Sequence, residues 1–238
     1  MIHAPSLGIG AAIAAVAMIG IFYVMDNTPT DTAFKTEDIK PSEAEPQAGQ
    51  PVKLSIFSEN ASPYLGNANA PITIVEFGDY QCFYCNKFFH ETEDQIYENY
   101  IKTGKVKMIF KDYTIIGPDS IVSAHAAHCA DEQGKFWEYH DTLYNNWNGE
   151  NNGWASAENQ LGFAKDLGLD MTAFSECMSS EKYQQKIQAS TNDAQTLGLT
   201  GTPGFFIIGP NNNVVRVPGA QPFDVFVNVL ESEEIKGN

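Results

Sequence analysis

Positive charge is scarce in this chain of 238 residues. Lys and Arg together number 14 against 30 Asp and Glu, which gives a formal net charge of -16, and the only arginine is Arg216. Proteins hold nucleic-acid phosphates with clustered Lys and Arg, so this composition argues against a nucleic-acid partner. The acidic surface favours solubility but does not indicate a substrate.

Cysteine is also scarce, with four in the whole chain. An even number favours disulfides in a chain that leaves the cytoplasm, although four cysteines permit three pairings. Cys82 and Cys85 form the only Cys-x-x-Cys motif. A zinc site usually needs a second ligand pair at comparable spacing, so the lack of one weakens that interpretation.

The N-terminus contains a long apolar run. Residues 7–25 carry no charge and would span roughly 28 Å as a helix, about one hydrocarbon core. No small-x-small cleavage site precedes Asp26, so we expect an uncleaved transmembrane anchor over residues 1–25 rather than a removed signal peptide. No Lys or Arg precedes the run to set its orientation. Residues 26–52 are rich in Pro, Thr, Glu, Asp and Gln and predict a disordered linker.

Residues 53–238 predict one α/β domain. A β-branched run over residues 71–77 suits a buried central strand, and helical spacing follows over residues 86–102. The remaining patterns predict a strand at 106–113, a helical block from 119 to about 198, strands at 205–208 and 214–217, and a helix from 222 to about 233. This order predicts a mixed sheet with helices on both faces.

The motif Cys82-Phe-Tyr-Cys85 falls between a predicted strand and a predicted helix. Unpaired N–H groups and the dipole at a helix N-terminus stabilise a thiolate, which is the attacking species in disulfide exchange. We therefore predict Cys82 as the exposed nucleophile and Cys85 as the buried resolving thiol. Half of a zinc site, or a static disulfide, is the alternative interpretation.

Two further features bear on this chemistry. Glu76 lies in an otherwise apolar strand, where burial would raise its pKa and let it exchange a proton with Cys85. A solvent-facing glutamate at the strand end is the alternative. The turn Gly201-Thr202-Pro203-Gly204 precedes a strand, which makes Pro203 a candidate for a cis bond, although an ordinary trans turn fits the residues as well.

Three segments resemble one family, the DsbA-like disulfide oxidoreductases of the thioredoxin superfamily. They are Ala70-Pro-Ile-Thr-Ile-Val-Glu-Phe-Gly-Asp-Tyr-Gln-Cys-Phe-Tyr-Cys85, Cys129-Ala-Asp-Glu-Gln-Gly-Lys-Phe-Trp-Glu-Tyr-His-Asp141 and Leu197-Gly-Leu-Thr-Gly-Thr-Pro-Gly-Phe-Phe206. The resemblance implies a thioredoxin-like fold with a helical insertion at about residues 118–180. It also implies that Pro203 is cis and faces the cysteine pair, that Thr202 lies beside the substrate backbone, and that Glu76 is the buried acid.

The chain departs from the family inside the motif. Many members have a Pro-containing pair between the cysteines, whereas this chain has Phe83 and Tyr84. The intervening pair helps to set the reduction potential, so a strongly oxidising character does not carry over. The two aromatic side chains could contact unfolded clients or simply pack against neighbouring loops.

The other two cysteines lie in the helical block. The resemblance implies a structural disulfide between Cys129 and Cys177, which the chain-entropy model would credit with about 4 kcal/mol. A second redox pair and two buried thiols are the alternatives. His125, His128 and Cys129 fall close together on one predicted helix, so a metal site is conceivable, but we expect none.

These observations predict a membrane-tethered, extracytoplasmic thiol–disulfide oxidoreductase. Its expected partners are cysteine-containing exported proteins and a membrane redox protein that restores the cysteine pair, and the redox-active disulfide makes an organic cofactor unnecessary. Capture of Cu(I) by Cys82 and Cys85 is one alternative, and a structural accessory subunit with a static disulfide is another. The sequence leaves the direction of the reaction open.

Overall fold

The computed structural model describes residues 53–237. The expected membrane anchor (1–25) and linker (26–52) lie outside the described residues. Within residues 53–237, every helix is too short or too polar to cross a membrane.

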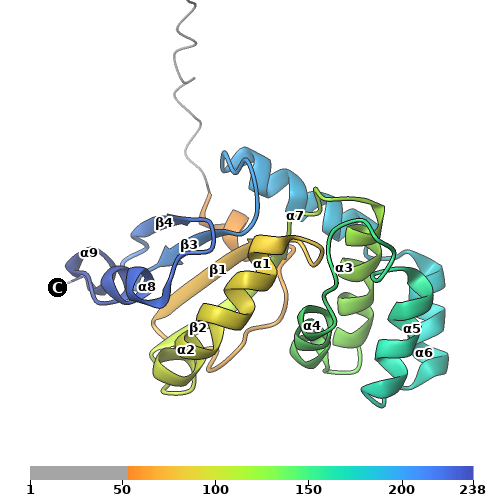
Figure 1. The fold of residues 1–238 in the computed structure, drawn as a ribbon. Coiled ribbons are helices and arrows are strands. Elements are labelled where there is room, and N and C mark those ends of the chain that lie inside the picture. Colours follow the sequence, from red (N-terminus) through yellow and green to blue (C-terminus); the bar gives the residue numbers. More distant parts are fainter. Residues whose placement is uncertain (1–52, 238) are drawn as a thin grey trace, which may run out of the picture. The chain divides into compact units, whose positions relative to one another are not determined.

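A four-stranded mixed sheet forms the centre of the domain (Figure 1). Its strands are β1 (Ile72–Gly78), β2 (Val106–Asp112), β3 (Gly204–Ile208) and β4 (Val214–Pro218). The order is β2-β1-β3-β4, with β1 and β2 parallel and the other two pairs antiparallel. The β-branched run in β1 therefore forms a central strand that is buried on both faces, as the sequence predicted.

One face of the sheet is covered by the helix that carries the cysteine motif and by the C-terminal helices. Ile72 and Ile74 of β1 pack here with Phe88 and Phe226. The elements on this face are α1 (Phe83–Phe88), the π-helical turns η2 (Phe89–Glu93) and η3 (Tyr97–Ile101) with α2 (Asp94–Ile96) between them, α8 (Phe223–Leu230) and α9 (Glu233–Lys236). The motif helix begins at Phe83, whereas the apolar spacing predicted a helix from residue 86. It begins earlier because residues of the cysteine motif themselves form its first turn.

The opposite face is covered by the short helix η1 (Leu54–Phe57) and by α7 (Gln184–Thr196). Val75 and Phe77 of β1 pack there against Phe206 and Ala194. Because side chains alternate along a strand, Glu76 points to the other face, toward the motif helix. The sheet thus has helices on both faces, as predicted.

Four helices between β2 and α7 form the insertion that the resemblance implied. They are α3 (Pro118–Asp131), α4 (Phe136–Asn145), α5 (Ala157–Asp166) and α6 (Met171–Ser180). Figure 1 shows them gathered beside the sheet, next to the N-terminal end of α1. Their core is continuous with Tyr80, Cys82, Cys85 and Phe110, so the insertion packs directly against the cysteine motif.

Candidate active site

The turn between β1 and α1 places the cysteine motif. Asp79 is buried, and its carboxylate accepts hydrogen bonds from the backbone N–H groups of Gln81 at 2.9 Å, Ile115 at 2.8 Å and Ile116 at 3.0 Å. The Cys82 N–H donates to the Asp79 carbonyl at 3.0 Å. One buried carboxylate thus joins the turn before Cys82 to the segment that follows β2, which fixes the start of α1.

Cys82 occupies the N-cap position of α1, with extended backbone angles of φ -68° and ψ 127°. The residue is 4% exposed, so the expectation of an exposed nucleophile is wrong. Its sulfur lies 3.4 Å from the Thr202 carbonyl oxygen. The pKa of Cys82 is lowered from 9.0 to about 6, chiefly because the Cys85 thiol donates a hydrogen bond to its thiolate. Burial opposes this change, while the Thr202 side chain and the N–H groups of Cys85 and Tyr84 add to it.

Cys85 lies on the first turn of α1 and is completely buried. Burial raises the pKa of its thiol well above 9.0, and the neighbouring Cys82 and Glu76 raise it further. In the structure neither sulfur of this pair is bonded to another sulfur. The two thiols of one motif therefore differ strongly in acidity: Cys82 is a thiolate at neutral pH and Cys85 is a neutral thiol.

Glu76 faces the underside of the motif helix from β1. The residue is 1% exposed, so the solvent-facing alternative is wrong. Neither carboxylate oxygen has a hydrogen-bond partner within residues 53–237. Burial, with the nearby Glu93 and Cys82, raises the pKa of Glu76 well above 4.5, which favours a protonated acid beneath the cysteine pair.

The loop before β3 lies opposite the cysteines. The Thr202–Pro203 peptide bond is cis in the structure, so the trans alternative is wrong. The Thr202 side-chain oxygen is buried without another partner among the described residues, which leaves its hydroxyl available to the Cys82 thiolate. The sequence features around 76, 82–85 and 202–203 thus come together in one site.

The two aromatic residues inside the motif lie at the surface. Phe83 is 49% exposed and Tyr84 is 58% exposed, and their rings contact each other with centroids 5.3 Å apart. Phe83 also contacts the ring of Trp147 at 5.9 Å. An apolar surface therefore borders the nucleophilic sulfur, and one side of Phe83 packs on a neighbouring loop.

That loop connects α4 with α5, and sequence reasoning did not connect it with the site. The Trp147 ring N–H donates to the Gln81 carbonyl at 2.8 Å, and the Asn151 N–H donates to the Gln81 side-chain oxygen at 3.0 Å. Glu150 accepts a hydrogen bond from the Phe83 N–H at 3.0 Å. These contacts join positions 66 to 70 residues apart in the chain, so no local pattern could have indicated them.

The remaining cysteines are bonded to each other. Cys129 and Cys177 form a disulfide between α3 and α6, with Cα atoms 5.7 Å apart, which is the pairing that the resemblance implied. The sulfurs lie near His125, but their bond removes the thiolate ligands that a metal site there would need. His128 is engaged elsewhere, since its ring Nε2 lies 2.7 Å from a carboxylate oxygen of Asp112.

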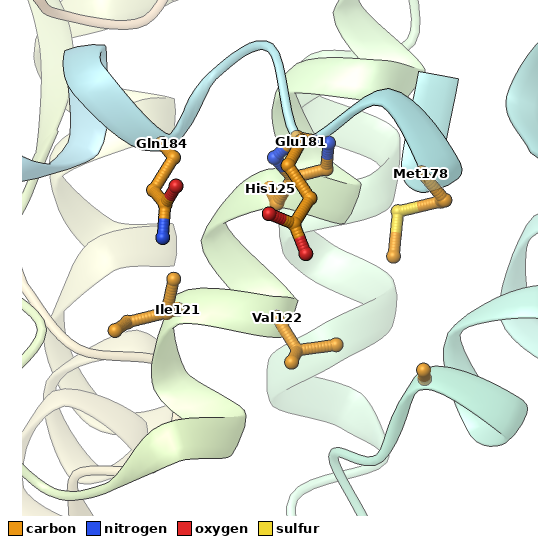
Figure 2. Close-up of a pocket in the computed structure, with 7 residues that line it drawn as sticks. Ile121, Val122, His125, Met178, Glu181 and Gln184 are labelled. Atoms are coloured by element: carbon orange, nitrogen blue, oxygen red, sulfur yellow. The ribbon is translucent and has the colours of Figure 1, made fainter. Parts of the chain in front are cut away.

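His125, which lies near this disulfide, also lines a cavity of about 190 Å³ (Figure 2). Figure 2 shows His125, Met178, Glu181 and Gln184 around it, with Ile121 and Val122 of α3 also lining it. No residue of the Cys82–Cys85 motif lines this cavity. It is therefore separate from the site described above.

Fold and site together define a class of protein. A mixed sheet with a Cys-x-x-Cys motif at the start of the helix after β1, and a cis-proline loop against the first sulfur, is a thioredoxin-type dithiol site. The family model described as Thioredoxin matches residues 58–217, and the chain belongs to this family.

Known proteins narrow this class. A probable disulfide bond formation protein D of Bacillus anthracis is 28% identical over 158 residues, covering 65% of this chain and 73% of that protein. The crystal structure of oxidised BdbD from Bacillus subtilis matches with a TM-score of 0.65 and 25% identity, over 74% of this chain and 93% of that one. Alpha-DsbA1 of Wolbachia pipientis matches with a TM-score of 0.63 and 25% identity, over 73% and 90%. The chain is a DsbA-like thiol–disulfide oxidoreductase.

Proposed function

We propose that this protein oxidises cysteine pairs in exported client proteins through the Cys82–Cys85 disulfide, tethered to the outer face of a membrane. The observation that carries the proposal is the geometry of the pair: Cys82 caps α1 with its sulfur 3.4 Å from the Thr202 carbonyl oxygen, and Cys85 is completely buried behind it. This setting lowers the pKa of Cys82 to about 6 and raises that of Cys85. A sulfur with a low pKa is a good leaving group. The client's second thiolate therefore readily displaces Cys82 from the mixed disulfide, which leaves the client with a disulfide of its own. Similar proteins of Bacillus are named disulfide bond formation proteins, which supports the same direction.

The reaction has two exchange steps. A client thiolate first attacks the Cys82 sulfur of the oxidised pair, which forms a mixed disulfide and expels Cys85 as a thiolate that takes up a proton. A second client thiolate then attacks the client sulfur of the mixed disulfide and expels Cys82 as a stable thiolate. The client loses two electrons and two thiol protons, and the cysteine pair gains the two electrons.

Glu76 is suited to supply the proton in the first step. It lies beneath the motif helix, it is buried, and its raised pKa favours the protonated form. The Cys85 thiolate that leaves the disulfide has a much higher proton affinity than an ordinary thiolate, because burial raises the pKa of Cys85. Transfer of a proton from Glu76 to Cys85 would neutralise the buried sulfur, and the reverse transfer would assist reoxidation.

The surface around Cys82 is suited to protein clients. Phe83 and Tyr84 offer exposed apolar area beside the sulfur, and the Thr202 backbone borders it on the other side. An unfolded client could place a cysteine between them, with its neighbouring apolar side chains on the two rings. Exchange through the cysteine pair needs no organic cofactor, but it needs a second redox protein that reoxidises the pair after each turnover.

The N-terminal sequence supports the membrane location of this proposal. The uncharged run at residues 7–25 has the length of a membrane span, and residues 26–52 have the composition of a flexible linker with an r.m.s. reach of roughly 30 Å. A tether of this kind raises the effective concentration of the domain near a membrane redox partner. Exposure of a substituted cysteine before residue 7 or within the linker to an impermeant thiol reagent on whole cells would test the orientation.

The catalytic proposal is tested with two matched single variants. Cys85→Ser retains the nucleophile and should accumulate a mixed disulfide with a reduced, unfolded client, whereas Cys82→Ser should trap none. Oxidised protein should also accelerate disulfide formation in that client, measured by mass spectrometry of alkylated thiols. Equal trapping by both variants, or stoichiometric Cu(I) binding without any oxidation, would contradict the proposal.

A further inference from the structure

Glu150 is the one acidic side chain hydrogen-bonded to the backbone of the cysteine motif in the described part of the chain. Its Oε1 accepts the Phe83 N–H at 3.0 Å, at the residue that directly follows Cys82. The next two N–H groups, of Tyr84 and Cys85, are among the groups that lower the pKa of Cys82. A carboxylate thus holds one N–H at the start of the motif helix while its neighbours face the sulfur.

The position of Glu150 is built into the fold. Trp147 and Asn151, on either side of it in the loop, both hydrogen-bond to Gln81, which is completely buried. The side-chain amide of Asn151 also donates to the Ile116 carbonyl at 3.0 Å. The α4–α5 loop therefore makes four hydrogen bonds to the motif turn and its surroundings. These bonds hold the Glu150 carboxylate at the motif.

The charge of Glu150 is not offset by an ion pair. No Lys or Arg of residues 53–237 lies within ion-pair distance of its carboxylate. The group therefore adds negative charge at the backbone N–H of the residue that follows Cys82, the residue on which the reduced protein develops a thiolate. A like charge disfavours the ionised form, whereas the disulfide form of the pair carries no charge and is affected much less.

We propose that Glu150 is a positioning residue that limits the oxidising strength of the Cys82–Cys85 pair. It disfavours the reduced, thiolate state relative to the disulfide, and it secures the α4–α5 loop on the motif at the same time. This inference rests on the proposed function, since it concerns the strength of the same pair as an oxidant. The relevant equilibrium is protein disulfide plus two glutathione thiols giving protein dithiol plus glutathione disulfide, which conserves electrons and protons.

The test compares the variants Glu150→Gln and Glu158→Gln with the parent in glutathione redox buffers at pH 7. The glutamine at 150 keeps an oxygen that can accept the Phe83 N–H but removes the charge. The control removes the same formal charge from an exposed residue of α5, which makes no ion pair within the described residues. A charge near a helix terminus changes an equilibrium by roughly two- to fivefold, so Glu150→Gln should shift the constant toward the dithiol by that factor.

Two further readouts separate charge from structure. Glu150→Gln should lower the pH midpoint of Cys82 alkylation, and the difference from the parent should shrink in 1 M salt, where exposed charges are screened. Glu150→Ala should show the same redox shift with a lower melting temperature, since it also releases the loop. The inference is overturned if Glu150→Gln matches Glu158→Gln, or if its redox constant moves toward the disulfide. A parent protein that equilibrates with glutathione but oxidises no client would instead defeat the proposed function alone.

Discussion

The acidity of Cys82 predicts a contribution to pH-dependent stability that is present only in the reduced protein. The pKa falls from 9.0 in an ordinary thiol to about 6 in the fold. A group with a lowered pKa stabilises the folded state above its ordinary pKa, and this contribution is lost as the pH falls through the folded value. By linkage, the Cys82 thiolate contributes between about 1 and 2 kcal/mol more to the stability of the reduced protein at pH 7 than at pH 5, and its contribution continues to grow up to about pH 9.

The measurement is urea unfolding of the reduced parent and of Cys82→Ser at pH 5, 6 and 7. Other titrating groups contribute to both proteins, so the difference between the two isolates the thiolate. The alkylation rate of Cys82, followed by peptide mass spectrometry, should show a midpoint near pH 6, while buried Cys85 should stay unmodified. A stability difference that does not change with pH, together with an alkylation midpoint above pH 8, would refute the reasoning.

Three other perturbations have definite outcomes. Glu76→Gln should slow the exchange steps that require proton transfer at Cys85 by roughly 10²-fold, measured by stopped-flow reduction of the oxidised protein. The rate of Cys82 alkylation in the same variant should not change. Thr202→Val should raise the pKa of the nucleophilic thiol, because a methyl group replaces a hydroxyl that stabilises the thiolate, and thiolate absorbance at 240 nm against pH would detect it. Cys129→Ala with Cys177→Ala should lower the free energy of unfolding by roughly 2–5 kcal/mol without changing the glutathione equilibrium of the active pair; a shift in that equilibrium would instead indicate a relay between the two pairs.

The sheet was accessible from the sequence because its signals are local. The β-branched run of β1 and the turn before β3 each occupy a few consecutive residues, and the structure places the strands within a residue or two of the predicted bounds. The burial of Glu76 could also be predicted from a local pattern. A glutamate that alternates with Val75 and Phe77 faces whatever covers the other side of the strand, and the motif helix covers it.

The cis state of Pro203 needed more than local signals. A proline before a strand fits either isomer, so only the resemblance to a known family pointed to cis, and the structure agrees. The Cys129–Cys177 pairing was similar, since four cysteines allow three pairings. In both cases the geometry depends on residues far away in the chain, which one sequence does not identify.

The contribution of the helical insertion to the site could not be predicted at all, and the reason is physical. Trp147, Glu150 and Asn151 lie in a polar, glycine-containing stretch whose pattern indicates only a loop. What gives them a role is the packing of the insertion core against Cys82 and Cys85, which brings the loop to Gln81. The motif helix makes the Cys82 thiol reactive. The negative charge of Glu150 at the motif backbone comes instead from the α4–α5 loop, whose position is set only by tertiary packing. The strength of the oxidant is therefore open to change at Glu150 without any change in the residues that carry out the exchange.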